Sequence, residues 1–399
     1  MNKSKSKKQQ VQGDQEGEAS LIGGVMQAQL NNILVLALDR QVRIRAEAVA
    51  CVSVLLTQGL VSPLHCIPNL VALETDQTVA IRDTAHAQLV ALHEKFPTLL
   101  HTPAIQGIQL SYSFQVKVFS HATVFAIDKD RKQYCLLGRL YTNCLRQIRA
   151  QRNMFLKALV NQFSDKGSLL ASTTILANPG AVLDQLCYLA KMIAALPYDV
   201  EDEPLYIVYL INRYVTLKLS STLQELRKEF AALGIAKEQI VDEDFDLATI
   251  DIHKYTGKRR DGEKLKSVLV QSCIAFAINL LIRVKFSLKA QYLLDNEKCH
   301  TYQPGNATKA TDQPVVLADR CLQMELPSDD DLQCENQLEL SWSLLCHTWS
   351  AAQEDQHQLD FESHEDPSRN RKKKGRRRKT VAKAQIEDDD DELVEGFDG

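Results

Sequence analysis

The feature that most constrains the fold is an internal repeat with an offset of 37 residues near the start of the chain. Eight positions match when the chain is compared with itself at this offset, and most are core types: Leu36/Leu73, Asp39/Asp76, Val42/Val79, Ile44/Ile81, Arg45/Arg82, Ala48/Ala85, Val52/Leu89 and Leu55/Leu92. Such a period is typical of helical pairs that stack and bury one face against the next unit. We therefore expect a helical repeat. The alternative is a plain helical hairpin of no repeat type.

The second unit shows how such a repeat would be built. Apolar residues fall on one helical face at Ile81, Ala85, Leu89, Leu92 and Phe96. Pro63 suits the first turn of the preceding helix. The pattern P-L-x-x-I-P-x-L-x-x-L-x-x-D-x-x-V-x-x-R-x-x-A, from residue 63, resembles a HEAT repeat. That resemblance implies that four residues tie neighbouring turns together: Asp39, Arg45, Asp76 and Arg82.

The rest of the chain also favours helices, because 16 Gly and 11 Pro in 399 residues leave few breakers. Further helices are expected at 104–120, 133–163, 181–196, 204–232, 263–294 and 332–351. The fold class expected is all-α, a HEAT-repeat solenoid with a disordered charged tail. The expected divisions are a disordered start at 1–19, HEAT repeats at 20–100, a helical solenoid at 101–300, an acidic segment with a possible helix at 301–352 and a disordered tail at 353–399.

The expected helix at 133–163 carries an electrostatic signal. Residues 131–164 contain Lys and Arg but neither Asp nor Glu. On a helical wheel, basic side chains lie opposite or beside an apolar stripe, and these are the candidate DNA-binding residues: Arg139, Arg146, Arg149, Arg152 and Lys157. A row of cations gains free energy on a phosphate backbone by counterion release. The alternative is a solvated helix face whose basic side chains cover apolar neighbours.

Sequence motifs for catalysis are absent. There is no phosphate loop, dinucleotide fingerprint, H-E-x-x-H or nucleophile elbow. The ten cysteines form no C-x-x-C pair, so we expect reduced thiols that pack as small hydrophobic groups, and no metal site. No signal peptide or membrane span is expected. We predict that the protein is not an enzyme and that it has no catalytic residues, metal or cofactor.

The tail contains two opposite charge runs. The basic run is typical of a nuclear localisation signal and consists of Arg371, Lys372, Lys373, Lys374, Arg376, Arg377, Arg378 and Lys379. Sequence-independent attraction to DNA is a compatible second role. The acidic run Glu387–Glu392 follows and is expected to screen the basic run or to meet basic chromatin proteins. A nuclear protein is predicted.

Three segments carry a resemblance to a known family. Residues 41–76, QVRIRAEAVACVSVLLTQGLVSPLHCIPNLVALETD, resemble the C-terminal region of the Nipped-B (adherin) family, the cohesin loaders of sister-chromatid cohesion. RQIRAQRNMFLKALVNQF (146–163) and ALPYDVEDEPLYIVYLINR (195–213) are similar to that region too, and a weaker similarity covers 281–305. The resemblance spans roughly residues 20–305.

The resemblance implies a non-enzymatic chromatin scaffold. Members are long, hook-shaped HEAT solenoids that contact cohesin and double-stranded DNA and promote cohesin loading, chromosome organisation and transcription regulation. They act with a smaller partner subunit that binds their N-terminal part. This chain resembles only the later part, so we expect a fragment or a reduced form that does not bind the loader's partner subunit. The alternative is a HEAT-repeat adapter of another nuclear or transport complex.

Overall fold

The computed structural model describes residues 21–165, 167–236, 239–240, 245–257, 261–306, 313–318, 324–327 and 336–364, without the side chains of residue 248 and of residues after 358. Contacts divide the chain into two units, 1–355 and 356–399, and the features described below lie in the first. Its first elements are a helix Leu21–Ala37, α2 (Val42–Thr57), α3 (Pro63–Leu73), α4 (Val79–Lys95), α5 (His101–Phe119), β1 (Phe125–Ile127) and β2 (Gln133–Cys135).

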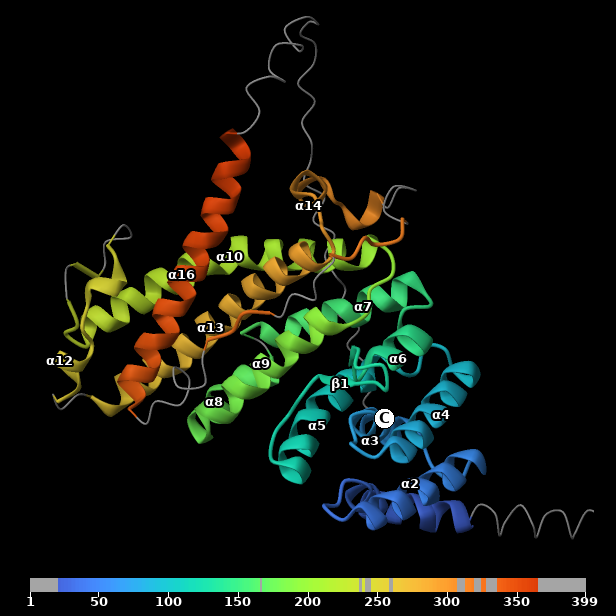
Figure 1. Cartoon of the computed structure of the whole chain (residues 1–399). Helices are drawn as coiled ribbons and strands as arrows, with labels where there is room; N and C mark the ends of the chain where they lie inside the picture. The colour runs from blue at the N-terminus through green and yellow to red at the C-terminus, as the bar shows by residue number, and fades with distance from the viewer. Residues whose placement is uncertain are drawn as a thin grey trace, which may run out of the picture. The chain divides into compact units, whose positions relative to one another are not determined.

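The later elements are mainly helical as well. Figure 1 shows them from cyan-green to red. They are α6 (Gly138–Leu140), a π-helical turn η1 (Tyr141–Leu145), α7 (Arg149–Val160), η2 (Asn161–Phe163), η3 (Ser168–Leu170), α8 (Ser172–Ala177), α9 (Pro179–Ala195), α10 (Asp202–Ala232), η4 (Leu247–Thr249), α12 (His253–Thr256), α13 (Gly262–Gln291), α14 (Asn296–Thr301), η5 (Pro304–Asn306) and α16 (Gln337–His364). The all-α, HEAT-like class is confirmed.

The repeat builds the N-terminal core as the 37-residue offset predicts. Helix α2 packs on α4, and α3 packs on both α4 and α5. The matched apolar positions Val52, Leu89 and Leu92 are buried in one continuous core. Gly107 brings α5 close to α3, because a Cβ there would lie 2.5 Å from Cβ of Val71.

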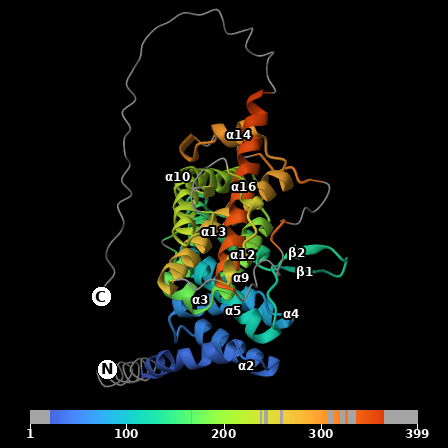
Figure 2. The same cartoon turned by 90° about the vertical axis from the view of Figure 1, so that its left-hand side faces the viewer.

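The expected single helix at 133–163 is wrong. Residues 125–127 and 133–135 pair as an antiparallel hairpin, and the chain then forms α6, η1 and α7. A break precedes α7, where Ile148 has an extended backbone and a 43% exposed side chain. Figure 2 shows the hairpin projecting beside the helices. The basic residues therefore lie on α6, on the bend after η1 and on α7, and not on one continuous helix.

Three long helices form the middle of the unit. Helix α13 packs on α9 and α10, and its stretch from Val268 to Leu288 is largely buried. Among the described helices, α13 has the length and apolar composition to cross a membrane, yet 67% of its most apolar window is buried inside the protein. Because the core helix of a folded domain has the same composition, this is weak evidence for a span.

A second apolar cluster holds the last helix. Phe230 of α10 and Trp342 of α16 meet edge to face with ring centroids 5.3 Å apart, and Leu345 is fully buried beside them. The sequence placed this helix at 332–351, whereas α16 runs from Gln337 to His364. Residues 353–364, expected to be disordered, are therefore helical.

Candidate nucleic-acid interface and a buried arginine–carboxylate cluster

The four repeat residues include an ion pair that links the first repeat to the second. The Arg45 guanidinium donates to both carboxylate oxygens of Asp76, at 2.6 and 3.2 Å, and to the carbonyl oxygens of Asp39 and Arg40. Asp76 also accepts the backbone N–H of Thr78 at 2.7 Å. Both members of the pair are buried, so the ion pair fixes α2 against the turn that begins α4.

The equivalent residue of the second repeat binds differently. Arg82 donates to the carbonyl oxygen of Asp76 at 2.7 Å and to the Tyr134 hydroxyl at 3.3 Å. An Asp at the next offset would stand at position 113, which is Ser113. The Asp–Arg pattern thus does not continue into a third repeat: position 113 lies within α5, and the hairpin follows that helix.

The first of the five candidate DNA-binding residues, Arg139, is engaged within the chain. Its guanidinium donates to the buried carboxylate of Glu74 at 2.8 Å and to Asp83 at 2.7 Å. Glu74 also lies 2.6 Å from Nδ1 of His86. Desolvation disfavours the charged form, but the two carboxylates outweigh it and raise the pKa of Arg139.

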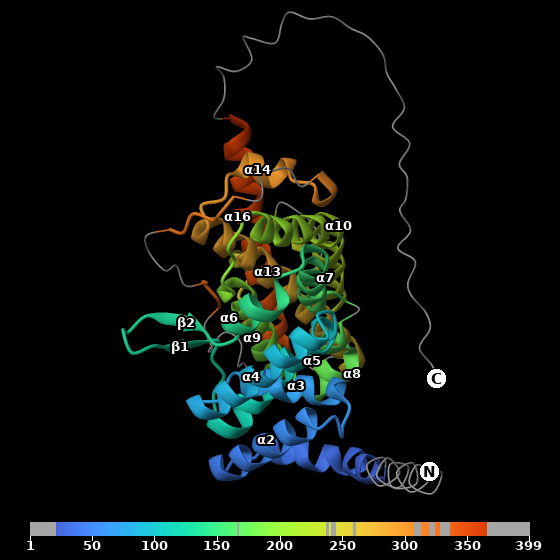
Figure 3. The same cartoon turned by 90° about the vertical axis from the view of Figure 1, so that its right-hand side faces the viewer.

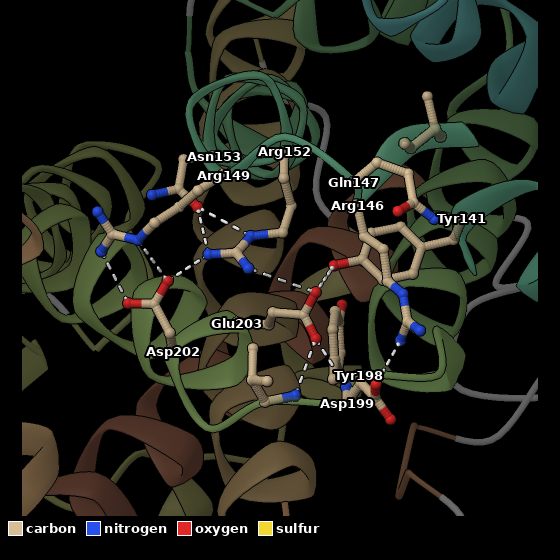
Figure 4. Close-up of polar contacts among 12 residues, drawn as sticks. Tyr141, Arg146, Gln147, Arg149, Arg152, Asn153, Tyr198, Asp199, Asp202 and Glu203 are labelled. Atoms are coloured by element: carbon tan, nitrogen blue, oxygen red, sulfur yellow. Dashed lines mark hydrogen bonds and ion pairs between the residues drawn. The ribbon is translucent and has the colours of Figure 1, made fainter. Parts of the chain in front are cut away.

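Arg149 and Arg152 lie one turn apart on α7 and share one carboxylate (Figure 4). Arg149 donates from Nε and Nη2 to the two oxygens of Asp202, at 2.9 and 2.8 Å. Arg152 also pairs with Asp202 and lies 3.6 Å from Glu203. Arg152 is 5% exposed, so it lies in the protein interior, whereas the helical wheel placed it beside the apolar stripe.

The carboxylate of Glu203 binds the loop before α10. One oxygen accepts the Tyr141 hydroxyl at 2.9 Å, and the other accepts the backbone N–H groups of Asp199 and Val200 at 2.7 and 3.3 Å. Acidic side chains in a first turn also interact favourably with the positive end of the helix dipole. The segment 199–203 is therefore held between α7, η1 and α10.

Tyrosines complete this cluster. Tyr302 donates to Asp202 at 2.7 Å, and Tyr198 packs edge to face on both Tyr141 and Tyr292. The sequence had shown the carboxylates of 199–203 but not their partners, which lie 50 to 100 residues away. The only local sign of this cluster in the sequence was a Pro-Tyr pair next to acidic residues.

The cluster is charge-balanced and unsuited to acid–base chemistry. Burial alone favours neutral Asp202, but hydrogen bonds from Arg149 and Tyr302 and the charge of Arg152 outweigh it and lower the pKa of that carboxyl. Burial, with Glu203 adjacent, raises the pKa of Tyr141 well above its ordinary value. A general base or acid works best with a pKa near the operating pH. The arrangement instead orients and stabilises the start of α10.

The remaining members of the basic row are Arg146 and Lys157. Arg146 is paired with Asp199 at 3.1 Å, with 25% of its side chain exposed, and Lys157 is exposed on α7. A phosphate would have to displace Asp199 from Arg146. DNA binding by the five residues stays a prediction; Lys157 is exposed, and Arg149, although it is bound to Asp202, keeps 41% of its side chain exposed.

The remaining predictions concern the basic run, the cysteines and a metal site. The residues of the basic run, 371–379, lie outside the described part of the chain. All eight described cysteines are free, and most are buried as expected, although Cys51 is exposed. Within the described ranges no group of three or more His, Cys, Asp or Glu side chains has the geometry for a metal ion.

Comparison with known proteins shows that the arginine–carboxylate cluster lies in a region that matches a protein family. A family model described as the sister chromatid cohesion C-terminus matches residues 22–214, which include the HEAT-like repeats, the hairpin and the arginine–carboxylate cluster. The human (Homo sapiens) Nipped-B-like protein is 29% identical over 212 residues, which are 53% of this chain and 7% of that protein. The Caenorhabditis elegans Nipped-B-like protein scc-2 is 26% identical over 316 residues, or 75% of this chain and 14% of that protein.

A third relative, Nipped-B protein of Drosophila melanogaster, is 24% identical over 307 residues, which are 75% of this chain and 14% of that protein. The chain thus spans a small part of the length of these relatives. Its matched residues nevertheless run without a break from the first helix to the middle of α10. Through residues 22–214, the chain belongs to the Nipped-B family of sister chromatid cohesion C-terminal regions.

Proposed function

We propose that this chain is a non-enzymatic scaffold that engages cohesin and supports cohesin loading on chromatin. The observation that carries the proposal is the match of residues 22–214 to the sister chromatid cohesion C-terminus. The structure supports a scaffold role, because the acidic segment 199–203 is bound by arginines and tyrosines that fix one fold. A HEAT-repeat adapter of another nuclear or transport complex is the alternative.

The test is capture of partners from nuclear extract on the immobilised full chain. Cohesin subunits should be enriched over beads that carry a HEAT-repeat protein of an unrelated transport complex. Because both baits have the same repeat architecture, enrichment on this chain alone would reflect its specific surface. Enrichment of transport adapters, with cohesin at the background level, would contradict the proposal and favour the alternative.

Nuclear residence is part of the same proposal and is assigned to the basic run 371–379. A fluorescent fusion of the full chain should accumulate in nuclei. Replacement of Lys372, Lys373, Arg377 and Arg378 by Ala should move it to the cytoplasm. Unchanged accumulation would exclude the run as the import signal.

A further inference from the structure

An open groove lies between the β1–β2 hairpin and the helices at its base. It has a volume of about 680 Å³ and is lined by residues of the hairpin, α6, α9 and the end of α13, and by Leu317 and Met324. Figure 3 shows the hairpin standing out beside α6 and α9. None of the hydrogen bonds or ion pairs of the Asp202–Glu203 cluster involves a residue that lines this groove.

The lining is apolar with a cationic margin. Apolar side chains include Val124, Phe125, Tyr134 and Leu317, and the last two are 39% and 64% exposed. Lys191 of α9 and Arg139 of α6 supply two positive charges, and the lining residues include neither Asp nor Glu. A ligand that presents aliphatic side chains beside carboxylates would match this surface in both polarity and charge.

The two cations differ in their availability. Arg139 is held by Glu74 and Asp83, yet its Nη2 is buried without a hydrogen-bond partner in the described structure. Lys191 is exposed on α9, and no described residue forms an ion pair with it. Lys191 is therefore the charge that an incoming carboxylate would meet first.

An extended stretch of this chain lies next to the groove. Glu201 donates its N–H to the carbonyl oxygen of Gln313 at 3.0 Å, and Val315 donates to Asp199 at 3.0 Å. Ala318 donates to Gln291 at 2.8 Å, next to Leu317 in the groove lining. Main-chain hydrogen bonds to an extended segment thus occur beside the groove and, at Gln291, at its edge.

The hairpin offers a further backbone edge. Val124 and Leu136 bond across the hairpin, as do Asp128 and Lys132, so the intervening Ile127 and Gln133 direct their N–H and C=O groups away from the partner strand. Within the described residues, no third strand joins this sheet. An open edge beside an apolar groove suits a peptide that binds as an added strand.

We propose that this groove binds an extended peptide of a partner protein, in which aliphatic residues are flanked by Asp or Glu. The peptide lies along the hairpin edge, its aliphatic side chains enter the groove, and its carboxylates meet Lys191 and Arg139. The groove would bind such a peptide whether or not the chain engages cohesin.

The test is fluorescence anisotropy with the full chain and a labelled short peptide of alternating Val and Thr flanked by Glu. Binding is expected, and Lys191→Glu should weaken it by about tenfold or more, because a charge reversal at the contact replaces attraction by repulsion. Lys228→Glu, at an exposed lysine of α10, is the matched control and should leave affinity unchanged. Leu317→Asp, at an exposed position, tests the apolar wall and should also weaken binding.

Two control peptides separate the contributions. Replacing Glu by Gln in the peptide should weaken binding to the wild-type chain and remove the effect of Lys191→Glu. Replacing Val by Ser should weaken binding to all variants. Equal affinity of the acidic and Gln peptides, or equal sensitivity to Lys191→Glu and Lys228→Glu, would overturn the proposal. Tighter binding of a DNA duplex with the same dependence on Lys191 would overturn it as well.

Discussion

Arg152 of α7 and Asp202 of α10 form an ion pair whose side chains are only 7% and 1% exposed. Arg149 binds the same carboxylate in a bidentate manner. The basic row that the sequence presented as a surface for phosphate is therefore, at these two positions, part of the link between α7 and α10. The same is true of Arg139, which joins α6 to Glu74 at the end of α3.

Loss of the Asp202 carboxylate should destabilise the fold. Asp202→Asn leaves two arginines without their anion, one of them buried, and breaking such a pair typically costs about 3 kcal/mol. Urea unfolding at neutral pH should show this loss in the free energy of unfolding. Asp83→Asn is the control, because this partner of Arg139 is 59% exposed and such pairs contribute about 1 kcal/mol or less. Equal effects of the two substitutions would contradict the structural role of the cluster.

His101 should make stability depend on pH in the mildly acidic range. Burial at the start of α5 lowers its pKa from the ordinary value of 6.5, against the bond of Nε2 with the carbonyl oxygen of Leu145. Because the folded pKa is depressed, its stabilisation is present above 6.5 and is lost as the pH falls through the folded value. The free energy of unfolding should therefore fall more steeply with decreasing pH in the wild-type chain than in His101→Gln. Parallel pH profiles of the two proteins would exclude this role.

Thiol labelling should be selective among the described cysteines. Cys51 is exposed on α2, whereas burial raises the pKa of Cys66 to about 11 and that of Cys135 to about 12. Since the thiolate is the reactive species, Cys51 should be alkylated rapidly at neutral pH and the other two slowly. Mass spectrometry of peptides after a short pulse of iodoacetamide measures this. Rapid labelling of Cys66 would contradict the packing of α3.

DNA binding should depend on Arg146 and Lys157, the members of the basic row whose replacement leaves the Asp202 and Glu74 ion pairs intact. Arg146→Glu with Lys157→Glu should weaken binding to a duplex and flatten its salt dependence, since each phosphate contact contributes about 0.9 to the log–log slope. Lys228→Glu with Lys264→Glu, at two exposed lysines elsewhere, is the charge-matched control. An unchanged slope in the first double variant would remove these residues from any DNA contact.

The helices that the sequence predicted well are those whose signal is local. The stripe Ile81, Ala85, Leu89 and Leu92 is buried as its spacing required, whereas its expected fifth member, Phe96, lies just after α4 and is 42% exposed. Helices α9 and α10 begin and end within two residues of the expected bounds. Their apolar periodicity alone determines which face is buried. The repeat offset likewise made Asp76 the equivalent of Asp39 and Arg82 the equivalent of Arg45, and Arg45 of the first repeat meets Asp76 of the second.

The break between η1 and α7 had no comparable signal. The strands Phe125–Ile127 and Gln133–Cys135 are too short for an alternating pattern, so periodicity favoured one continuous helix. A helical wheel also cannot show that Arg152 meets Asp202, because the partner lies on another helix. The basic row therefore looked solvent-facing, although long-range ion pairs decide where its side chains lie.

Direct binding of purified cohesin to the immobilised full chain is the most direct test of the scaffold function. Interferometry should record saturable binding of cohesin to the immobilised chain, and this binding should not require ATP hydrolysis by the chain. Cohesin should not bind an unrelated HEAT-repeat protein that is immobilised at the same density. Circular dichroism and a cooperative unfolding transition would first establish that the immobilised chain is folded. Saturable, selective binding is the expected result, and absence of binding to a folded chain would contradict it.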